Sequence, residues 1–175
     1  MTQHESTPRR TPPPSGWRRW AFRLPIRLYR AGLGPLLGKR FLLLHHTGRT
    51  SGRQRQAVIE VVSYDAHAGT WIVASGFGPK SDWYQNLRHR PEAAVQFGRR
   101  RFTVTAHFLT PGEGADIMAA YAKKHPRAAR RLCSLMGFPV DGSEAGYRGV
   151  GEATPFVRLE DAARSREGGR PTPPA

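Results

Sequence analysis

The sequence has little cysteine, little lysine, few acidic residues and no long apolar run. A single cysteine, Cys133, excludes an internal disulfide and any metal site that needs several cysteines. No apolar run reaches the roughly 18 residues that a membrane-spanning helix needs. Residues 1–15 are polar and proline-rich, so we expect no signal peptide. These features favour a single domain that works in a reducing cytoplasm.

The shortage of acidic residues leaves the chain strongly basic. Thirteen acidic residues oppose 28 basic ones, which gives a formal net charge of +15 and a pI near 11.3. Of the basic residues, 24 are arginine and 4 are lysine. Arginine offers planar, bidentate donors that suit phosphates and carboxylates. This excess points to an anionic partner: nucleic acid, an acidic membrane face or a polyanionic small molecule.

Apolar patterning and turn residues predict an α+β fold. Strands are expected at 41–47, 55–64, 70–75, 93–97, 101–109 and 154–160. Helices are expected at 17–37, 81–90, 110–124 and 126–136. Thr110, followed three residues later by Glu113, has the pattern of a capping box. Six strands with hairpin-length links favour an antiparallel barrel with flanking helices.

The two ends of the chain differ in composition from its middle. Residues 1–15 and 161–175 are rich in proline and polar residues, and we expect both to be disordered tails around one domain at 16–160. Within that domain, residues 17–37 form an amphipathic basic stretch that Pro25 interrupts. Its apolar side could pack on the barrel. Its aromatic residues and arginines would equally suit an anionic membrane surface at the inner face of the cell membrane.

The first stretch with chemical potential is TGRTSGRQR, at 47–55. Gly48 and Gly52 permit tight backbone turns, so neighbouring amides can point at one anion. Hydroxyl and guanidinium groups surround the two glycines. The stretch therefore suits a phosphate or a carboxylate, and a solvated basic turn is the alternative that the residues leave open.

The second stretch is ASGFGPKSDWYQNL, at 74–87. A predicted strand ends in a glycine-rich loop that leads into a helix, with Ser81 as its capping residue. Free amides and the helix dipole favour an anion at such a position. Gly76 and Gly78 would let a flat ring or a phosphate approach the backbone closely. As a glycine motif alone, this pattern is also compatible with a plain loop.

Together, the two stretches resemble the paired signature of the deazaflavin-dependent nitroreductase family. RFLLLHHTGRTSG, WYQNL and GRRRF follow the family's order, and the resemblance covers residues 40–160. It implies an FMN-binding split-barrel-like fold that uses reduced coenzyme F-420 as a hydride donor to quinones, enones or nitro compounds. The rival interpretations are a non-catalytic protein that binds deazaflavin or FMN, and a basic nucleic-acid-binding module. The sequence leaves a homodimer open.

Carried over residue by residue, the resemblance implies a coenzyme site with three parts. The loop for the phosphate and the lactyl-glutamyl tail would comprise Gly48, Arg49, Thr50, Ser51, Gly52 and Arg55. The deazaflavin ring would pass along Val73, Ala74, Ser75 and Gly76. Lys80, Trp83, Tyr84 and Asn86 would complete the phosphate pocket and its wall.

Two residues are candidate proton donors to the substrate. Ser75 lies in the stretch expected to contact the deazaflavin ring, residues 73–76, which we call the ring loop. His125 can donate a proton near neutral pH as an imidazolium. The best-known relative clusters tyrosines near the start of its last helix. The matching stretch is interpreted here as 125–131, which lacks tyrosine, so we expect weak nitroimidazole reduction. His45 and His46 are adjacent in a strand and should point to opposite faces, so we expect no metal site that uses both.

Overall fold

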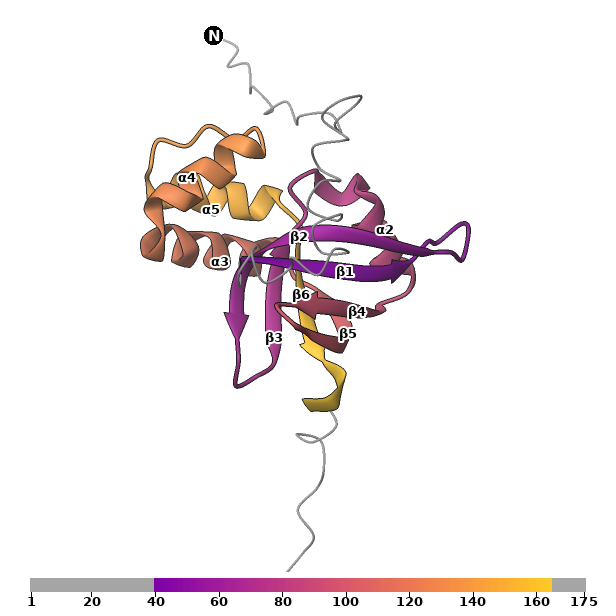
Figure 1. The fold of residues 1–175 in the computed structure, drawn as a ribbon. Coiled ribbons are helices and arrows are strands. Elements are labelled where there is room, and N and C mark those ends of the chain that lie inside the picture. Colours follow the sequence, from indigo (N-terminus) through magenta and orange to yellow (C-terminus); the bar gives the residue numbers. More distant parts are fainter. Residues whose placement is uncertain (1–39, 165–175) are drawn as a thin grey trace, which may run out of the picture.

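Six antiparallel strands close into a barrel in the computed structural model, which describes residues 40–164 (Figure 1). The strands are β1 (Phe41–Thr47), β2 (Gln54–Asp65), β3 (Thr70–Ala74), β4 (Glu92–Phe97), β5 (Arg100–Phe108) and β6 (Phe156–Asp161). Their order around the barrel is β1-β2-β3-β6-β5-β4. The predicted α+β class and six-stranded antiparallel barrel are therefore confirmed.

Alternation along the strands separates a barrel interior from an outer face. In β3, Trp71 and Val73 are fully buried inside the barrel, whereas Ile72 and Ala74 pack against the helices. Trp71 is the centre of an aromatic cluster, with ring centroids 5.2 Å from Tyr64 and 4.9 Å from Phe102. This cluster fills the barrel with side chains and leaves ligand sites to its outer face and rims.

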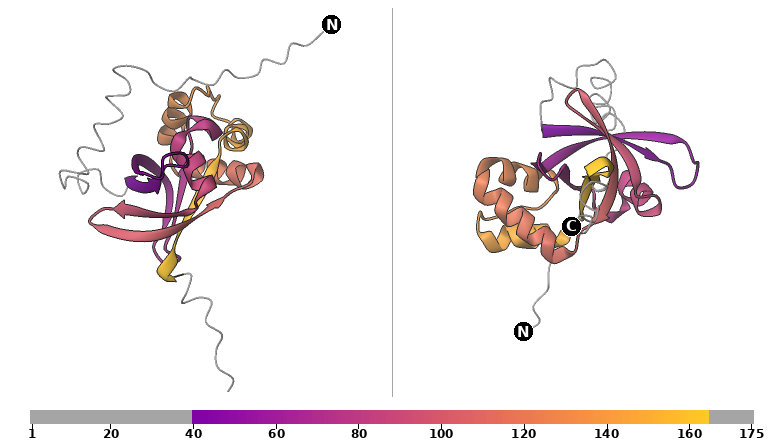
Figure 2. Two further views of the ribbon diagram at one scale, coloured as in Figure 1. Left: turned by 90° about the vertical axis from the view of Figure 1, so that its right-hand side faces the viewer. Right: turned by 90° about the horizontal axis from the view of Figure 1, so that it is seen from below.

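Within residues 40–164, four α-helices flank the barrel. They are α2 (Asp82–His89), α3 (Pro111–Lys124), α4 (Pro126–Leu135) and α5 (Glu144–Ala153), and a short 3₁₀ turn, η2 (Gly78–Lys80), precedes α2. Helices α3, α4 and α5 gather on one side of the barrel, and α2 stands apart from them (Figure 2). The predicted capping box of α3 is present, since Thr110 and Glu113 bond each other's backbone amides. No helix within residues 40–164 has the length and apolar character needed to cross a bilayer.

Helix α5 was absent from the sequence-based prediction. Its segment contains three glycines, which lower helix propensity by about 1 kcal/mol each relative to alanine. Packing against α3 explains them: a Cβ on Gly151 would lie 2.6 Å from the Cα of Ala115, and one on Gly114 would lie 2.6 Å from the carbonyl oxygen of Gly151. Close backbone contact between the two helices thus overrides local propensity.

Several predictions fall partly or wholly beyond the described chain. The basic stretch at 17–37 and the tail at 1–15 lie outside residues 40–164 and stay predictions. The C-terminal tail was placed at 161–175, but Asp161 is the last residue of β6 and 162–164 form a helical turn. Arg164 donates a hydrogen bond to the carbonyl of His67, which ties this turn to the β2–β3 hairpin.

Candidate functional site

The loop between β1 and β2, residues 48–53, closes on itself through backbone bonds. The amide of Gly48 donates to the carbonyl of Arg53 at 2.9 Å, and that of Gly52 donates to the carbonyl of Gly48 at 2.8 Å. Gly52 has a φ of 64°, which favours glycine. The amides of Thr50 and Ser51 form no hydrogen bond within residues 40–164. Two exposed donors are thus available at the tip of this loop.

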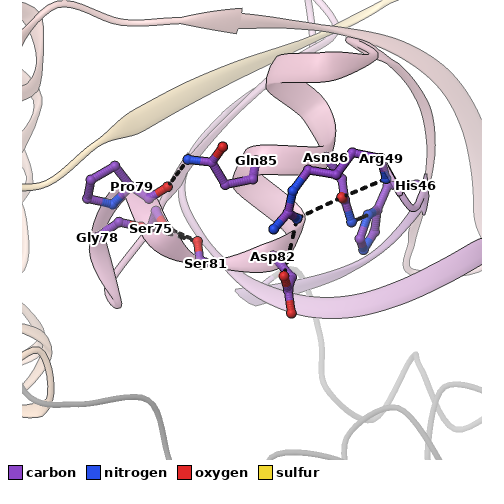
Figure 3. A network of polar contacts seen from close by, with 9 residues as sticks. All are labelled: His46, Arg49, Ser75, Gly78, Pro79, Ser81, Asp82, Gln85 and Asn86. Carbon is purple, nitrogen blue, oxygen red and sulfur yellow. Dashed lines mark hydrogen bonds and ion pairs between the residues drawn. The ribbon is translucent and has the colours of Figure 1, made fainter. Parts of the chain in front are cut away.

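Asn86 of α2 holds this loop in place (Figure 3). Its Oδ1 accepts from both the backbone amide and the Nη1 of Arg49, each at 3.0 Å. Its Nδ2 lies 3.0 Å from Nδ1 of His46 and donates to it, because Oδ1 already accepts twice. Arg49 also pairs with Asp82, with 3.2 Å between Nη1 and Oδ1. The β1–β2 loop at 48–53, called the arginine loop below, and α2 therefore form one hydrogen-bonded unit.

The N-terminus of α2 lacks the side-chain cap that Ser81 was predicted to supply. Ser81 occupies the N-cap position, but its hydroxyl lies 2.5 Å from that of Ser75 and 3.2 Å from the carbonyl of Gly78. The first three amides of the helix consequently form no hydrogen bond within the described chain. With the Arg49 guanidinium beside this first turn, amides and a cation converge where an anion is favoured.

The predicted ring loop is tightly bonded up to Ser75 and open at Gly76. Ser75 is buried, its amide donates to Pro155 at 2.8 Å, and its hydroxyl donates to the carbonyl of Gly78 at 2.7 Å. The amide of Gly76 forms no hydrogen bond within residues 40–164. A Cβ on Gly76 would lie 3.1 Å from Cγ of Met136, so this methionine lies against the glycine.

The structure places the other predicted site residues in three environments. Val73 and Tyr84 are buried in the barrel core, so neither side chain faces a surface. Trp83 is half-buried beside Tyr84, and Lys80 is exposed at the end of η2. Arg55 lies back over the arginine loop, with its Nε 3.6 Å from the position of a Cβ on Gly48. Any contact between Val73 and a ligand would therefore involve its backbone.

The two candidate proton donors do not come together. Met136, the C-cap of α4, lies against Gly76, whereas His125 is the N-cap of the same helix. The ten residues of α4 between them put His125 and Met136 roughly 16 Å apart at the α-helical rise. The hydroxyl of Ser75 is engaged within its own loop. The structure thus brings Ser75 to the glycine-rich loop and leaves His125 at a distance from it.

The stretch at 125–131, which was matched to the tyrosine cluster of the best-known relative, lies at the start of α4. In this chain one more helix, α5, follows α4 and leads into β6. The start of α5 contains Tyr147, which is buried among the helices. The expectation of weak nitroimidazole reduction, which rests on that match, stays a prediction.

His46 is a part of the site that its sequence position did not reveal. It follows Leu42 and Leu44 on the inward face of β1 and is 4% exposed. Burial lowers the pKa of His46 to about 4, with Arg55 and His45 acting in the same direction and Asp82 opposing them. The imidazole is therefore neutral near pH 7, which leaves Nδ1 free to accept the bond from Asn86.

We expect His46 to make the fold sensitive to acid. An unfolded chain takes up this proton as the pH falls below 6.5, whereas the folded chain resists until about pH 4. The stabilising contribution of neutral His46 is thus fully present above pH 6.5. As the pH falls from 6.5 to 4, the free energy of unfolding should drop by on the order of 2 kcal/mol. Urea unfolding at pH 7.0 and 4.5 measures this difference in the free energy of unfolding. The difference should shrink in His46→Gln and persist in His89→Gln, a control at an exposed histidine. An equal drop in both variants would contradict this origin.

The family model and the curated relatives that match this chain describe the same family. Residues 21–132 match the family model described as F-420H(2)-dependent quinone reductase. A protein of that name from Mycobacterium tuberculosis is 34% identical over 71 residues, which are 40% of this chain and 47% of that protein. The chain thus spans about half the length of the curated relatives it matches.

Two solved structures illustrate the similarity in three dimensions. A structure described as an F-420-H2 dependent reductase is 19% identical, with a TM-score of 0.47, covering 70% of this chain and 95% of that chain. An FMN-binding protein related to pyridoxamine 5'-phosphate oxidase, from Nostoc punctiforme, is 14% identical with a TM-score of 0.49. That match covers 84% of this chain and 81% of the other.

Proposed function

Because the chain belongs to the F-420H(2)-dependent quinone reductase family, we propose that it binds coenzyme F-420 and transfers hydride from its reduced form to a quinone. The curated relatives that it matches carry this activity in their names, and the chain spans about half of their length. Enones and nitro compounds are further electron-poor acceptors to which the same chemistry applies. We place FMN second as the cofactor, because the family that the chain belongs to is described by its use of F-420.

The residues of the two loops fit a coenzyme with a phosphate, an anionic tail and a flat ring. Unbonded amides at Thr50, at Ser51 and in the first turn of α2 suit phosphate oxygens. The guanidinium groups of Arg49 and Arg55 suit the phosphate and the glutamyl carboxylates. The open amide of Gly76 and its lack of a side chain suit the edge of a ring. The set therefore offers donors for each anionic part of the coenzyme.

One observation carries the proposal: Asn86 fixes Arg49 beside the uncapped N-terminus of α2. A solvated basic turn has no need of a buried asparagine that bonds both the backbone and the side chain of one arginine. Preorganised donors lose less conformational entropy when they bind an anion. The arrangement accordingly favours an anion-binding site over the plain turn.

In this proposal the bound coenzyme supplies the hydride, and the chain supplies binding and orientation. Arg49, Arg55 and the α2 amides hold the anionic end. The hydrogen bonds of Ser75 to Gly78 and Ser81 fix the shape of the ring loop. The amide of Gly76 would then be free to bond the edge of the coenzyme's ring. Met136 lies at the same glycine and limits the space on that side. We assign Ser75 as a positioning residue, since its hydroxyl is occupied within the loop.

Arg49→Ala should weaken F-420 binding by about 1.5–3 kcal/mol, the scale of a hydrogen bond to a charged group. This corresponds to a roughly tenfold to 150-fold higher Kd. Fluorescence titration of F-420 measures the change, with urea unfolding to verify that the variant is folded. Arg99→Ala, an exposed arginine in the β4–β5 turn, is the matched control and should bind normally. Equal F-420 affinity of the wild-type chain and Arg49→Ala would contradict the proposed role of the loop and favour a solvated basic turn.

A further inference from the structure

The molecule has a second small-molecule site, we propose, in a cavity between α3 and the outer face of β2 and β3. It would take a small amphipathic organic anion, such as an aromatic carboxylate. The cavity has a volume of about 340 Å³, near the lower end of the range for ligand pockets, roughly 300–1,000 Å³. This inference is independent of the proposed F-420 chemistry, because none of the coenzyme-loop residues lines the cavity.

A bulge in β2 and one face of α3 create the cavity. The register of β2 against β3 shifts between Val61 and Ser63, and the side chains that follow one another there all border the cavity. Such a bulge re-aims side chains that would otherwise alternate between the two faces of a sheet. From the opposite side, α3 contributes Ile117, Ala120, Tyr121 and Lys124, which share one helical face.

Both sides of the cavity carry apolar side chains. Val62 and Ile72 contribute from the strands, and Ile117 and Ala120 contribute from α3. Tyr64 also borders the cavity, but its ring points into the barrel, where it stacks on the buried Trp71 at 5.2 Å. A flat or aliphatic group of modest size can therefore contact apolar side chains from both sides of the cavity.

The mouth of the cavity is polar and positively charged. Lys124 and His125 are exposed there, and neither has an ion-pair partner among residues 40–164. The ring of Tyr121 lies 5.4 Å from that of His125, and burial raises the pKa of Tyr121, so its hydroxyl stays a donor. Among the described residues no carboxylate lines the cavity, and nearby Glu60 is paired with Arg40 at 2.9 Å.

Apolar walls under a cationic, hydrogen-bonding mouth favour a ligand with an apolar body and one anionic head. A carboxylate at the mouth would meet the ammonium of Lys124 and the hydroxyl of Tyr121. A neutral ligand of the same shape would keep only the apolar contacts. The class of ligand is thus set by Tyr121 and Lys124 near the end of α3 and by His125, the N-cap of α4, at the end of α4 that is remote from Gly76.

Calorimetric titration of the full chain with naphthoate, and with naphthylmethanol as the neutral analogue, tests the site. Naphthoate should bind more tightly than the alcohol. Lys124→Gln should raise the Kd of naphthoate roughly tenfold and leave that of the alcohol nearly unchanged. Lys123→Gln, the exposed neighbour on the same turn, is the matched control and should bind as the wild-type chain does.

Ala120→Leu gives a second variant that fills the cavity from an exposed helix position and should abolish binding of both compounds. Its titration with F-420 should match that of the wild-type chain, which separates this site from the coenzyme loops. Absence of naphthoate binding to the wild-type chain would overturn the proposal. Equal weakening by Lys123→Gln, or displacement of naphthoate by F-420, would overturn it as well.

Discussion

Replacing Gly151 by alanine should destabilise the chain by about 3 kcal/mol or more, since overpacking against backbone atoms is costly. The added Cβ would lie 2.6 Å from the Cα of Ala115 and 2.7 Å from the carbonyl carbon of Gly114. No flexible side chain is there to move aside, so α3 and α5 would have to separate. Urea unfolding followed by circular dichroism measures the loss.

The same helix provides the matched control. A Cβ on Gly149 would meet no atom within 4 Å, so Gly149→Ala should gain the helix propensity of alanine, about 0.5–1 kcal/mol. Opposite signs at positions two residues apart would establish the backbone contact as the reason for the glycine. Similar stabilities for the two variants would contradict the packing described for α3 and α5.

Asn86→Leu should affect both stability and coenzyme binding. The variant removes the acceptor of two bonds from Arg49 and the donor to His46, at a side chain that is 4% exposed. Unsatisfied buried partners cost about 1–3 kcal/mol each, so we expect a loss of about 3 kcal/mol in the free energy of unfolding. With the arginine loop released from α2, the Kd for F-420 should rise at least tenfold, or about 1.4 kcal/mol.

Asn86→Asp separates the two halves of that network. A carboxylate still accepts from Arg49, but it turns an oxygen instead of an amide toward Nδ1 of His46, which favours a protonated imidazole. The pKa of His46 should therefore rise from about 4, which an NMR titration of the ring protons reads directly. Coenzyme binding should fall less than in Asn86→Leu. An unchanged pKa of His46 would show that Asn86 does not set its protonation.

The sequence predicts those parts of the fold that depend on local patterning. Alternation and turn residues located the six strands, and Thr110 with Glu113 marked the start of α3. Helix α5 escaped because its glycines are explained only by the approach of α3. The cap at Ser81 was misjudged for a similar reason: the hydroxyl of Ser75, six residues earlier, competes for the Ser81 side chain.

The candidate site shows the same division between local and long-range information. Both loops were located by their glycines and basic residues. Their connection was not, because His46 and Asn86 are 40 residues apart in sequence and Arg49 and Asn86 are 37 apart. Helix α4 was predicted, but local patterning did not show that its C-terminal end packs against Gly76 and its N-terminal end carries His125 away from that glycine. Pairwise bonds across the chain are decided by packing, which a single sequence does not display.

A single-turnover experiment with reduced F-420 tests the central proposal most directly. The wild-type chain would be saturated with reduced F-420 and mixed with a quinone, and the return of the oxidised coenzyme's absorbance would be followed against a protein-free sample. A parallel titration would compare the affinity for F-420 with that for FMN. We expect tighter binding of F-420 and oxidation of the coenzyme that depends on the protein and is slowed in Arg49→Ala. Equal or tighter binding of FMN, or oxidation no faster than without protein, would contradict the proposed function.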